Sequence, residues 1–157
     1  LKVLSRSALK IRMEEARERR EKVVFTNGCF DLLHVGHLHL LQRARAFGDL
    51  LVVGINDDES IRKLKGPGRP LITQEQRSEI LASLRFVDHV TIFSEPTPLR
   101  VLRAVRPDVL VKGGDYSLKQ VIGKKWVENN GGRVELVPLL PGFSTSSLIS
   151  AILNSER

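Results

Sequence analysis

Short apolar runs alternate with longer amphipathic segments along the whole chain, and this alternation restricts the fold more than any other feature. Runs suited to strands cover residues 23–27, 50–56, 87–93, 108–112 and 133–137. The run at 50–56 is apolar almost throughout, which is typical of a strand covered on both faces of a parallel sheet. Because helices separate the strands, right-handed crossovers are expected. The sequence predicts an α/β fold, an open parallel sheet of about five strands with helices on both faces.

Helix signals fill the intervals between these runs. Residues 7–21 are predicted to be helical with Ser7 as N-cap, and 37–47 follow the first strand. A capping box at 73–76 opens a helix to about 84, and Pro98 takes the first position of the next. Further helices are expected near 118–129 and 144–154, whereas 57–72 is predicted to be a polar loop. We expect residues 1–157 to form one domain, with an N-terminal helix at 1–22 and the core at 23–157.

Composition excludes several classes of protein. Hydrophobic residues make up 41% and charged residues 27%, and no apolar run reaches the ~20 residues that span a bilayer. A single cysteine excludes an internal disulfide framework and fits a reducing cytoplasm. The net charge of +7 favours anionic partners. Because aromatic residues are only 5% and no RNA-binding signature is interleaved with the basic residues, we expect small phosphorylated substrates rather than nucleic acid or membrane.

The junction between the first strand and its helix carries the chemistry. It reads Thr-Asn-Gly-Cys-Phe-Asp-Leu-Leu-His-Val-Gly-His over residues 26–37. A helix N-terminus attracts phosphate because its free N–H groups and dipole favour an anion. Gly36 permits close approach of the backbone, and His34 and His37 can stabilise charge that develops on a phosphoryl group. The junction therefore predicts a nucleotide-phosphate site.

Other readings of the two histidines stay open. A His-x-x-His spacing could hold a metal ion, and His39 lies close by. No glutamate completes an HExxH frame, and Cys29 is the only cysteine, so few further zinc ligands exist. The imidazoles could also be ordinary core or surface residues. We interpret His39 as an ordinary helix residue.

Polar clusters follow four of the five predicted strands. Ligands of open parallel sheets of the Rossmann-like type bind outside the carboxyl ends of the strands, so these clusters should converge on one edge. They are 27–31 with the two histidines, 56–58, 112–115 and 144–146. Each cluster alone could be a simple turn or cap. Their common placement points to a single ligand site.

These residues resemble the cytidylyltransferase-like branch of the HxGH nucleotidyltransferases. Four further stretches, at 56–66, 69–77, 110–116 and 142–146, are similar to the adenylyltransferase domain of the bifunctional heptose kinase/adenylyltransferases of lipopolysaccharide synthesis. The resemblance covers about residues 20–155. Since no sugar-kinase domain is visible, the chain is expected to be a stand-alone form or a domain of such a fusion.

The resemblance implies a reaction in which ATP and D-glycero-β-D-manno-heptose 1-phosphate give ADP-heptose and pyrophosphate. The sugar phosphate would attack the α-phosphorus in line, with Mg²⁺ as cofactor and without a covalent enzyme intermediate. Catalysis would then consist of positioning and charge stabilisation. A cytoplasmic homodimer is also implied.

The resemblance also implies roles for individual residues. His34, His37 and Lys63 would be catalytic, the histidines at the triphosphate and the lysine neutralising phosphates. Nucleotide-binding residues would be Thr26, Asn27, Gly28, Cys29, Phe30, Gly36, Arg77, Lys112, Gly114, Ser144, Thr145 and Ser146. Substrate-binding residues would be Asp31, Asn56, Asp57, Lys65 and Asp115. For Lys63 and Lys65 the alternative is plain solvent exposure, and for Arg77 a surface ion pair with Glu75 or Glu79.

Departures from related motifs separate the remaining hypotheses. Ser146 stands where the family often has a second threonine, and the hydroxyl is kept. Ser147-Leu148-Ile149 replaces the arginine-ending motif of pantetheine-phosphate and mononucleotide adenylyltransferases, which disfavours those activities. A CTP-dependent cytidylyltransferase for glycerol 3-phosphate or phosphoethanolamine is the main alternative, although 139–141 lacks the arginine typical of its relatives. A non-catalytic basic module that binds nucleotide or RNA is the third hypothesis; it predicts no turnover.

Overall fold

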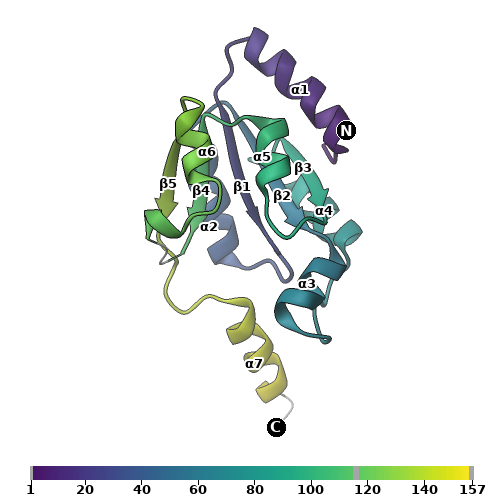
Figure 1. The fold of residues 1–157 in the computed structure, drawn as a ribbon. Coiled ribbons are helices and arrows are strands. Elements are labelled where there is room, and N and C mark those ends of the chain that lie inside the picture. Colours follow the sequence, from purple (N-terminus) through teal and green to yellow (C-terminus); the bar gives the residue numbers. More distant parts are fainter. Residues whose placement is uncertain (1, 115–116, 156–157) are drawn as a thin grey trace.

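A five-stranded parallel sheet forms the centre of the molecule. The computed structural model describes residues 2–114 and 117–155 (Figure 1). The strands lie in the order β3-β2-β1-β4-β5, and every neighbouring pair is parallel. Their bounds are β1 Val23–Gly28, β2 Leu50–Asn56, β3 His89–Phe93, β4 Val109–Gly113 and β5 Arg133–Val137. The predicted α/β fold and its strand number are confirmed.

Helices cover both faces of this sheet. They are α1 Arg6–Glu18, α2 Val35–Arg45, α3 Asp58–Lys65, α4 Gln74–Ser83, α5 Leu99–Val105, α6 Lys124–Asn129 and α7 Thr145–Ser155, with a short 3₁₀ helix η1 at Leu118–Gln120. Residues of α1, α5 and α6 pack against one face in one apolar cluster, and residues of α2 and α4 pack against the other. Helices α3 and α7 lie beyond the carboxyl ends of the strands (Figure 1). None of the helices in the described ranges is both long and apolar enough to cross a membrane.

The alternation of side chains along each strand divides the core. Phe25 and Leu110 belong to the cluster under α1, α5 and α6, whereas Val24 and Val111 belong to the cluster under α2. All seven residues of β2 are buried, as expected for a central parallel strand. The order of the strands reverses at β1, because β2 lies on one side of it and β4 on the other. A ligand crevice is expected at the carboxyl ends of β1 and β4.

Several predicted boundaries differ from the structure. The first helix is capped by Ser5 rather than Ser7, and α2 begins two residues earlier than predicted. Pro98 precedes α5 instead of opening it. The predicted helix at 118–129 is interrupted before α6 at Gly123, whose φ of 93° is in the left-handed region.

The predicted loop at 57–72 is the largest error, because it contains α3. The Asp57 carboxylate accepts a hydrogen bond from the Ser60 N–H at 2.8 Å and caps this helix. Asp58 and Glu59 in the first turn and three basic residues in the last turn match the helix dipole. Only Ile61 is buried, and a helix of eight residues with two apolar side chains, Ile61 and Leu64, gives a short signal that the polar composition of the stretch outweighed.

At the amino ends of the strands, three aspartates that each directly precede a strand accept backbone hydrogen bonds. Asp108 accepts a hydrogen bond from the Val23 N–H at 2.7 Å. Asp49 accepts one from Lys22, and Asp88 accepts one from Leu51, both at 2.8 Å. Each carboxylate thereby satisfies a backbone donor at the amino end of a neighbouring strand. These bonds fix how far each strand extends past the next.

We predict that Asp108→Ala lowers the free energy of unfolding by about 1 kcal/mol, because a charge-assisted bond across β1 and β4 is lost at a partly solvated site. Urea denaturation measures the change. Glu18→Ala, on the exposed end of α1, is the matched control. Equal stability of the two variants would contradict the assignment.

Candidate active site

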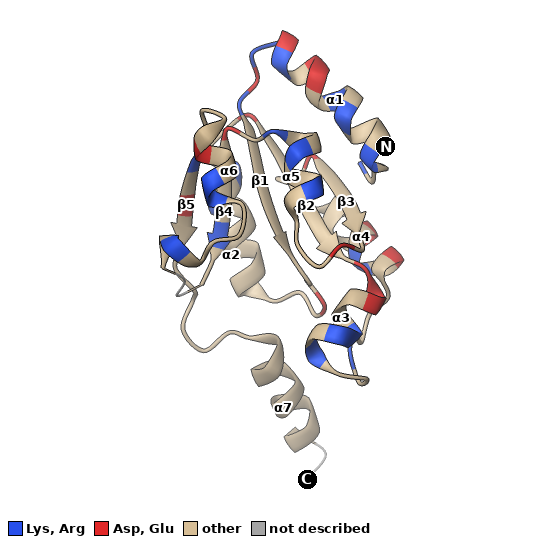
Figure 2. Cartoon of the chain, viewed as in Figure 1, with Lys and Arg blue, Asp and Glu red and all other residues tan. Residues whose placement is uncertain are grey.

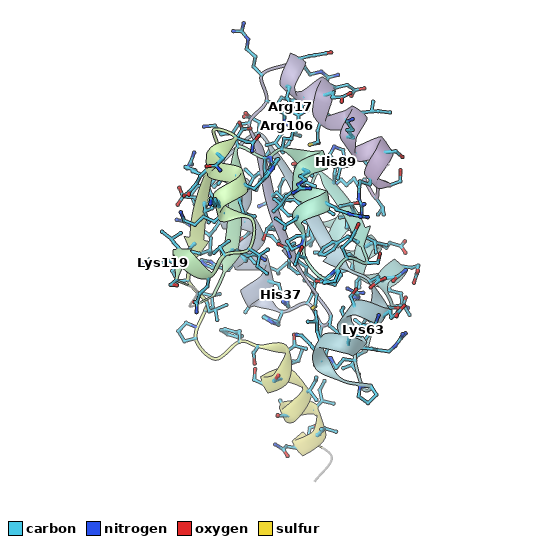
Figure 3. The ribbon with its side chains drawn as sticks, viewed as in Figure 1. Arg17, His37, Lys63, His89, Arg106 and Lys119 are labelled. Carbon is cyan, nitrogen blue, oxygen red and sulfur yellow. The ribbon has the colours of Figure 1, made fainter. Side chains whose placement is uncertain are left out.

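Two imidazoles lie together at the N-terminus of α2. The rings of His34 and His37 stack with centroids 3.9 Å apart and planes inclined by 29°. The Phe30 ring lies 5.2 Å from His37 on another side. Figure 3 shows His37 near the carboxyl end of the sheet, where α2 begins. The predicted convergence of the two histidines on a helix N-terminus is therefore present.

The backbone fixes which nitrogen of His34 carries a proton. His34 is the N-cap of α2, and its Nδ1 accepts a hydrogen bond from the Gly36 N–H at 3.1 Å. Nδ1 must be unprotonated to accept, so a neutral His34 carries its proton on Nε2. That N–H is then available as a donor to an anion. A Cβ on residue 36 would lie 2.9 Å from the His34 ring, which explains the glycine.

Both imidazoles are uncharged at neutral pH. The pKa of His37 is lowered from 6.5 to about 4, mainly by burial and further by His34 and Lys65, while the Leu32 backbone acts in the opposite direction. Burial also lowers the pKa of His34. The pair therefore offers neutral N–H donors, and an anion bound beside it would raise both pKa values.

The lysines of α3 are placed differently from the prediction. Lys63 is exposed and its Nζ lies 2.6 Å from Glu59 Oε1, one turn away. Its side chain extends outward from α3, away from His37 (Figure 3). Lys65, expected to be the weaker contributor, is the lysine close enough to lower the pKa of His37. Lys65 thus acts electrostatically on His37, whereas Lys63 is paired with Glu59.

Asp31 is buried rather than open to a substrate. Its carboxylate accepts hydrogen bonds from Arg69 Nε at 2.6 Å, Leu71 N at 2.8 Å and Ile72 N at 3.0 Å. The side chain is 1% exposed. The expectation that Asp31 orients a sugar or ribose is corrected, because its oxygens are occupied by the segment between α3 and α4.

Arg77 is the largest fully buried side chain and does not face solvent. Its guanidinium donates to the carbonyls of Cys29 at 2.6 Å, Asn56 at 2.8 Å and Ile72 at 3.1 Å, and to Asp58 Oδ1 at 2.8 Å. A surface ion pair with Glu75 or Glu79 is therefore wrong, and a direct phosphate contact is not supported. Arg77 instead joins the ends of β1 and β2 to the starts of α3 and α4.

Other residues of the first junction shape the site without reaching into it. Thr26 is fully buried, so it cannot contact a nucleotide as predicted. Phe30 is 4% exposed and has a φ of 47°, a conformation that turns the chain sharply before the histidines. A Cβ on Gly28 would lie 3.1 Å from the Phe30 ring. The thiol of Cys29 lies 3.9 Å from Asn56 Oδ1.

A second polar group lies on the other face of the sheet. Lys112 Nζ on β4 donates to Asn27 Oδ1 on β1 at 2.7 Å. Burial lowers the pKa of Lys112 to about 8. Both side chains, together with Asn56 at the end of β2, line a cavity of about 180 Å³. These three predicted site residues do converge.

The remaining predicted site residues lie at two places, after β4 and at the start of α7. Gly114 has a φ of 124° and donates to the Val137 carbonyl at 3.1 Å, next to the carboxyl end of β4. Ser144 Oγ accepts from the Ser147 N–H at 3.0 Å at the start of α7, with Thr145 and Ser146 in the first turn. A Cβ added to Gly36 would lie 3.6 Å from Phe143, so the residue before this turn is close to the start of α2. No residue of α7 itself is buried. Asp115 lies outside the described residues.

Sequence reasoning missed two residues that shape the site. Asp58 pairs with Arg77, and Arg69 pairs with Asp31 at 16% side-chain exposure. Both stand in the stretch that was predicted to be an irregular loop. An acidic first turn after the Asp57 cap was the signal available for Asp58. Arg69 begins the stretch 69–77 that carries the family resemblance, but no role was predicted for it.

Comparison with known proteins assigns the chain to a family. The profile of the cytidylyltransferase-like family matches residues 25–148, from β1 into α7. The chain belongs to the cytidylyltransferase-like family. Its similarity extends further to the bifunctional protein HldE of several bacteria. It is 55% identical over 153 residues to HldE of Syntrophotalea carbinolica and 58% identical over 145 residues to HldE of Geobacter sulfurreducens.

The matched part of these relatives is limited. The alignments cover 98% and 92% of this chain but 31% and 29% of the two HldE proteins. The chain thus spans about a third of the length of the curated relatives it matches.

Two solved structures share the fold. The lipopolysaccharide core biosynthesis protein of Thermoplasma volcanium is 26% identical with a TM-score of 0.63, covering 76% of this chain and 97% of that one. Pantoate-beta-alanine ligase of Francisella tularensis has the same TM-score at 17% identity, covering 99% and 78%, and shows likeness of fold alone.

We predict that Gly36→Ala weakens ATP binding at least fivefold, because the new methyl group displaces the His34 ring and breaks its bond to the backbone. Isothermal titration calorimetry gives the dissociation constant, and thermal unfolding checks the fold. Val35→Ala, at a neighbouring exposed position, is the control. Unchanged affinity of the Gly36→Ala variant would show that the His34 ring is not needed where it stands.

We predict that His37 makes the protein less stable as the pH falls from 6.5 toward 4. In this window the unfolded chain, with a histidine pKa near 6.5, binds a proton that the folded protein excludes. Thermal unfolding at several pH values measures the stability of wild type and His37→Gln, with His39→Gln as control. The loss of stability with falling pH should be smaller for His37→Gln only. Parallel plots of stability against pH for all three proteins would exclude the depressed pKa.

Proposed function

We propose that this chain transfers AMP from ATP to D-glycero-β-D-manno-heptose 1-phosphate, giving ADP-heptose and pyrophosphate for lipopolysaccharide core synthesis. The observation that carries the proposal is the neutral pair His34–His37, stacked at the N-terminus of α2 beyond the carboxyl end of the sheet. A helix N-terminus with two imidazole donors is suited to hold a triphosphate and to stabilise charge during transfer.

Similarity supports the choice of substrate. The chain is more than half identical to the matched part of HldE from Syntrophotalea carbinolica. The T. volcanium protein of related structure is named for lipopolysaccharide core biosynthesis. We extend the reaction of HldE and the role in lipopolysaccharide core synthesis to this chain. We also propose that residues 1–157 act as one nucleotidyltransferase unit. The reaction is proposed to occur in the cytoplasm, with a homodimer as the active form, which light scattering can test.

The proposed chemistry is a single displacement. A phosphate oxygen of the sugar 1-phosphate attacks the α-phosphorus of ATP, the new P–O bond forms opposite the bond to the β-phosphate, and that bond breaks to release pyrophosphate. The Nε2–H of His34 and a ring N–H of His37 stabilise the charge on the transferred phosphoryl group. No side chain forms a covalent intermediate, so Cys29 needs no role as a nucleophile.

Mg²⁺ is proposed to enter with ATP. In the described parts of the chain, no group of three or more His, Cys, Asp or Glu residues is arranged to hold a metal ion. This fits an ion bound mainly by phosphate oxygens and water, which is how Mg²⁺ is commonly held in nucleotide enzymes. The positive end of α2 and Lys65 would share the remaining charge of the triphosphate.

We predict that His37→Gln lowers kcat for pyrophosphate release from ATP and heptose 1-phosphate by 100-fold or more, the usual cost of removing one donor to a transferred group. His39→Gln, on the same helix, should stay within twofold of wild type. The panel includes CTP, GTP and UTP, with glycerol 3-phosphate and phosphoethanolamine as other acceptors.

Each result of this panel has a distinct meaning. Release only with ATP and heptose 1-phosphate supports the proposal. Release with CTP and another acceptor keeps the chemistry but overturns the substrate. If the wild-type protein releases no pyrophosphate with any pair of substrates, a non-catalytic nucleotide-binding module is favoured.

A further inference from the structure

The cavity beside Lys112 is separated from the histidine pair by the sheet itself. Its polar lining comes from three adjacent strands: Asn56 on β2, Asn27 on β1 and Lys112 on β4. Side chains alternate along a strand, and Phe25, Val52 and Leu110, two or four positions earlier, lie in the cluster under α1 and α5. The row of polar groups therefore continues that face past the end of the core, while α2 and its histidines occupy the other face.

The bond between Lys112 and Asn27 crosses the point where the strand order reverses. Thr26 is paired with Val111, so the next residues of β1 and β4 stand side by side, and their side chains are 2.7 Å apart. The ammonium has two further N–H groups that Asn27 does not take. A partly buried cation with spare donors at a switch point is suited to recognising oxygen atoms of a ligand.

The walls of the cavity restrict what can enter. Phe93, Pro96 and Pro98 provide apolar surface, and Leu64 and Ile122 stand at 66% and 50% exposure on its rim. The volume of about 180 Å³ is below the ~300 Å³ at which drug-sized ligand sites begin. Apolar walls with two amides and one ammonium match a single polyhydroxylated ring better than a nucleoside with its phosphates.

We propose that this cavity binds the sugar ring of the acceptor and that Lys112 is a specificity-determining residue, which selects polyhydroxylated acceptors through hydrogen bonds to their hydroxyl oxygens. The inference rests on the proposed function and deepens it. It moves Lys112 and Asn27 from the predicted nucleotide site to the acceptor site. Nucleotide and acceptor then approach from opposite faces of β1 and meet at its carboxyl end.

Binding of each substrate alone tests this assignment. Calorimetry would measure the dissociation constants of heptose 1-phosphate and of ATP for wild type, Lys112→Met and Lys112→Arg. Lys119→Met is the matched control, since Lys119 is exposed on η1 and does not line the cavity (Figure 3). Lys112→Met should raise the dissociation constant of heptose 1-phosphate at least tenfold and leave that of ATP within twofold of wild type. Lys112→Arg should recover part of the loss.

A second variant keeps the test valid if Lys112→Met fails to fold. Ile122→Trp places a larger side chain at the exposed rim of the cavity. It should prevent binding of heptose 1-phosphate and leave the affinity for ATP unchanged. Loss of ATP affinity with unchanged heptose 1-phosphate in these variants would overturn the inference, as would unchanged affinity for both. Because binding needs no turnover, a protein that binds the sugar through Lys112 but releases no pyrophosphate would refute the proposed reaction alone.

Discussion

The buried guanidinium of Arg77 holds together the part of the molecule on which function depends. It has no exposed side-chain surface, and it ties the carbonyls at the ends of β1 and β2 to the segments that begin α3 and α4. Burying a charge is costly unless it is paired and its hydrogen bonds are made, and here Asp58 and three carbonyls meet both conditions. Lysine could not replace it, because a single ammonium lacks the planar fork that reaches four acceptors in different directions. Asp31 adds a second buried link to the same segment through Arg69. The turn that leads to His34 and His37 is thereby fixed to the helix that carries Lys65.

Charged side chains are unevenly distributed over the helices, and α3 carries both acidic and basic residues. Figure 2 shows basic residues on α3, α5 and α6 and a last helix, α7, with neither acidic nor basic side chains. The histidines remain neutral because partial burial lowers the pKa of both, and His34 and Lys65 lower that of His37 further, so they contribute donors without adding repulsive charge before the substrate arrives. Lys112 is partly buried too, yet it keeps an ammonium at neutral pH, since its pKa falls only to about 8. In our proposals, one face of β1 binds the phosphates of the nucleotide and the other binds the sugar ring of the acceptor.

The sequence was sufficient for local features and insufficient for contacts between distant segments. Apolar runs and caps predicted all five strands, and the His-Val-Gly-His spacing located the pair at the start of α2. The burial of Asp31 and Arg77 could not be predicted, because a charged residue is expected at the surface and only tertiary structure brings Asp31 to Arg69 or Arg77 to Cys29, 38 and 48 positions away. The pairing of Lys63 with Glu59 was not predicted either, since it depends on how the side chains of α3 are arranged. That helix was missed because it is short and mostly polar, with only Ile61 buried.

The central claim is that the α-phosphorus of ATP is attacked directly by the acceptor phosphate. The most direct measurement is to run the reaction with ATP labelled at the α- or the γ-phosphorus, and with α-thio-ATP of known configuration. The account predicts that the α-label alone appears in the sugar nucleotide, that the γ-label leaves as pyrophosphate, and that configuration at the α-phosphorus inverts. Transfer of the γ-label to the sugar, or retention of configuration, would contradict it.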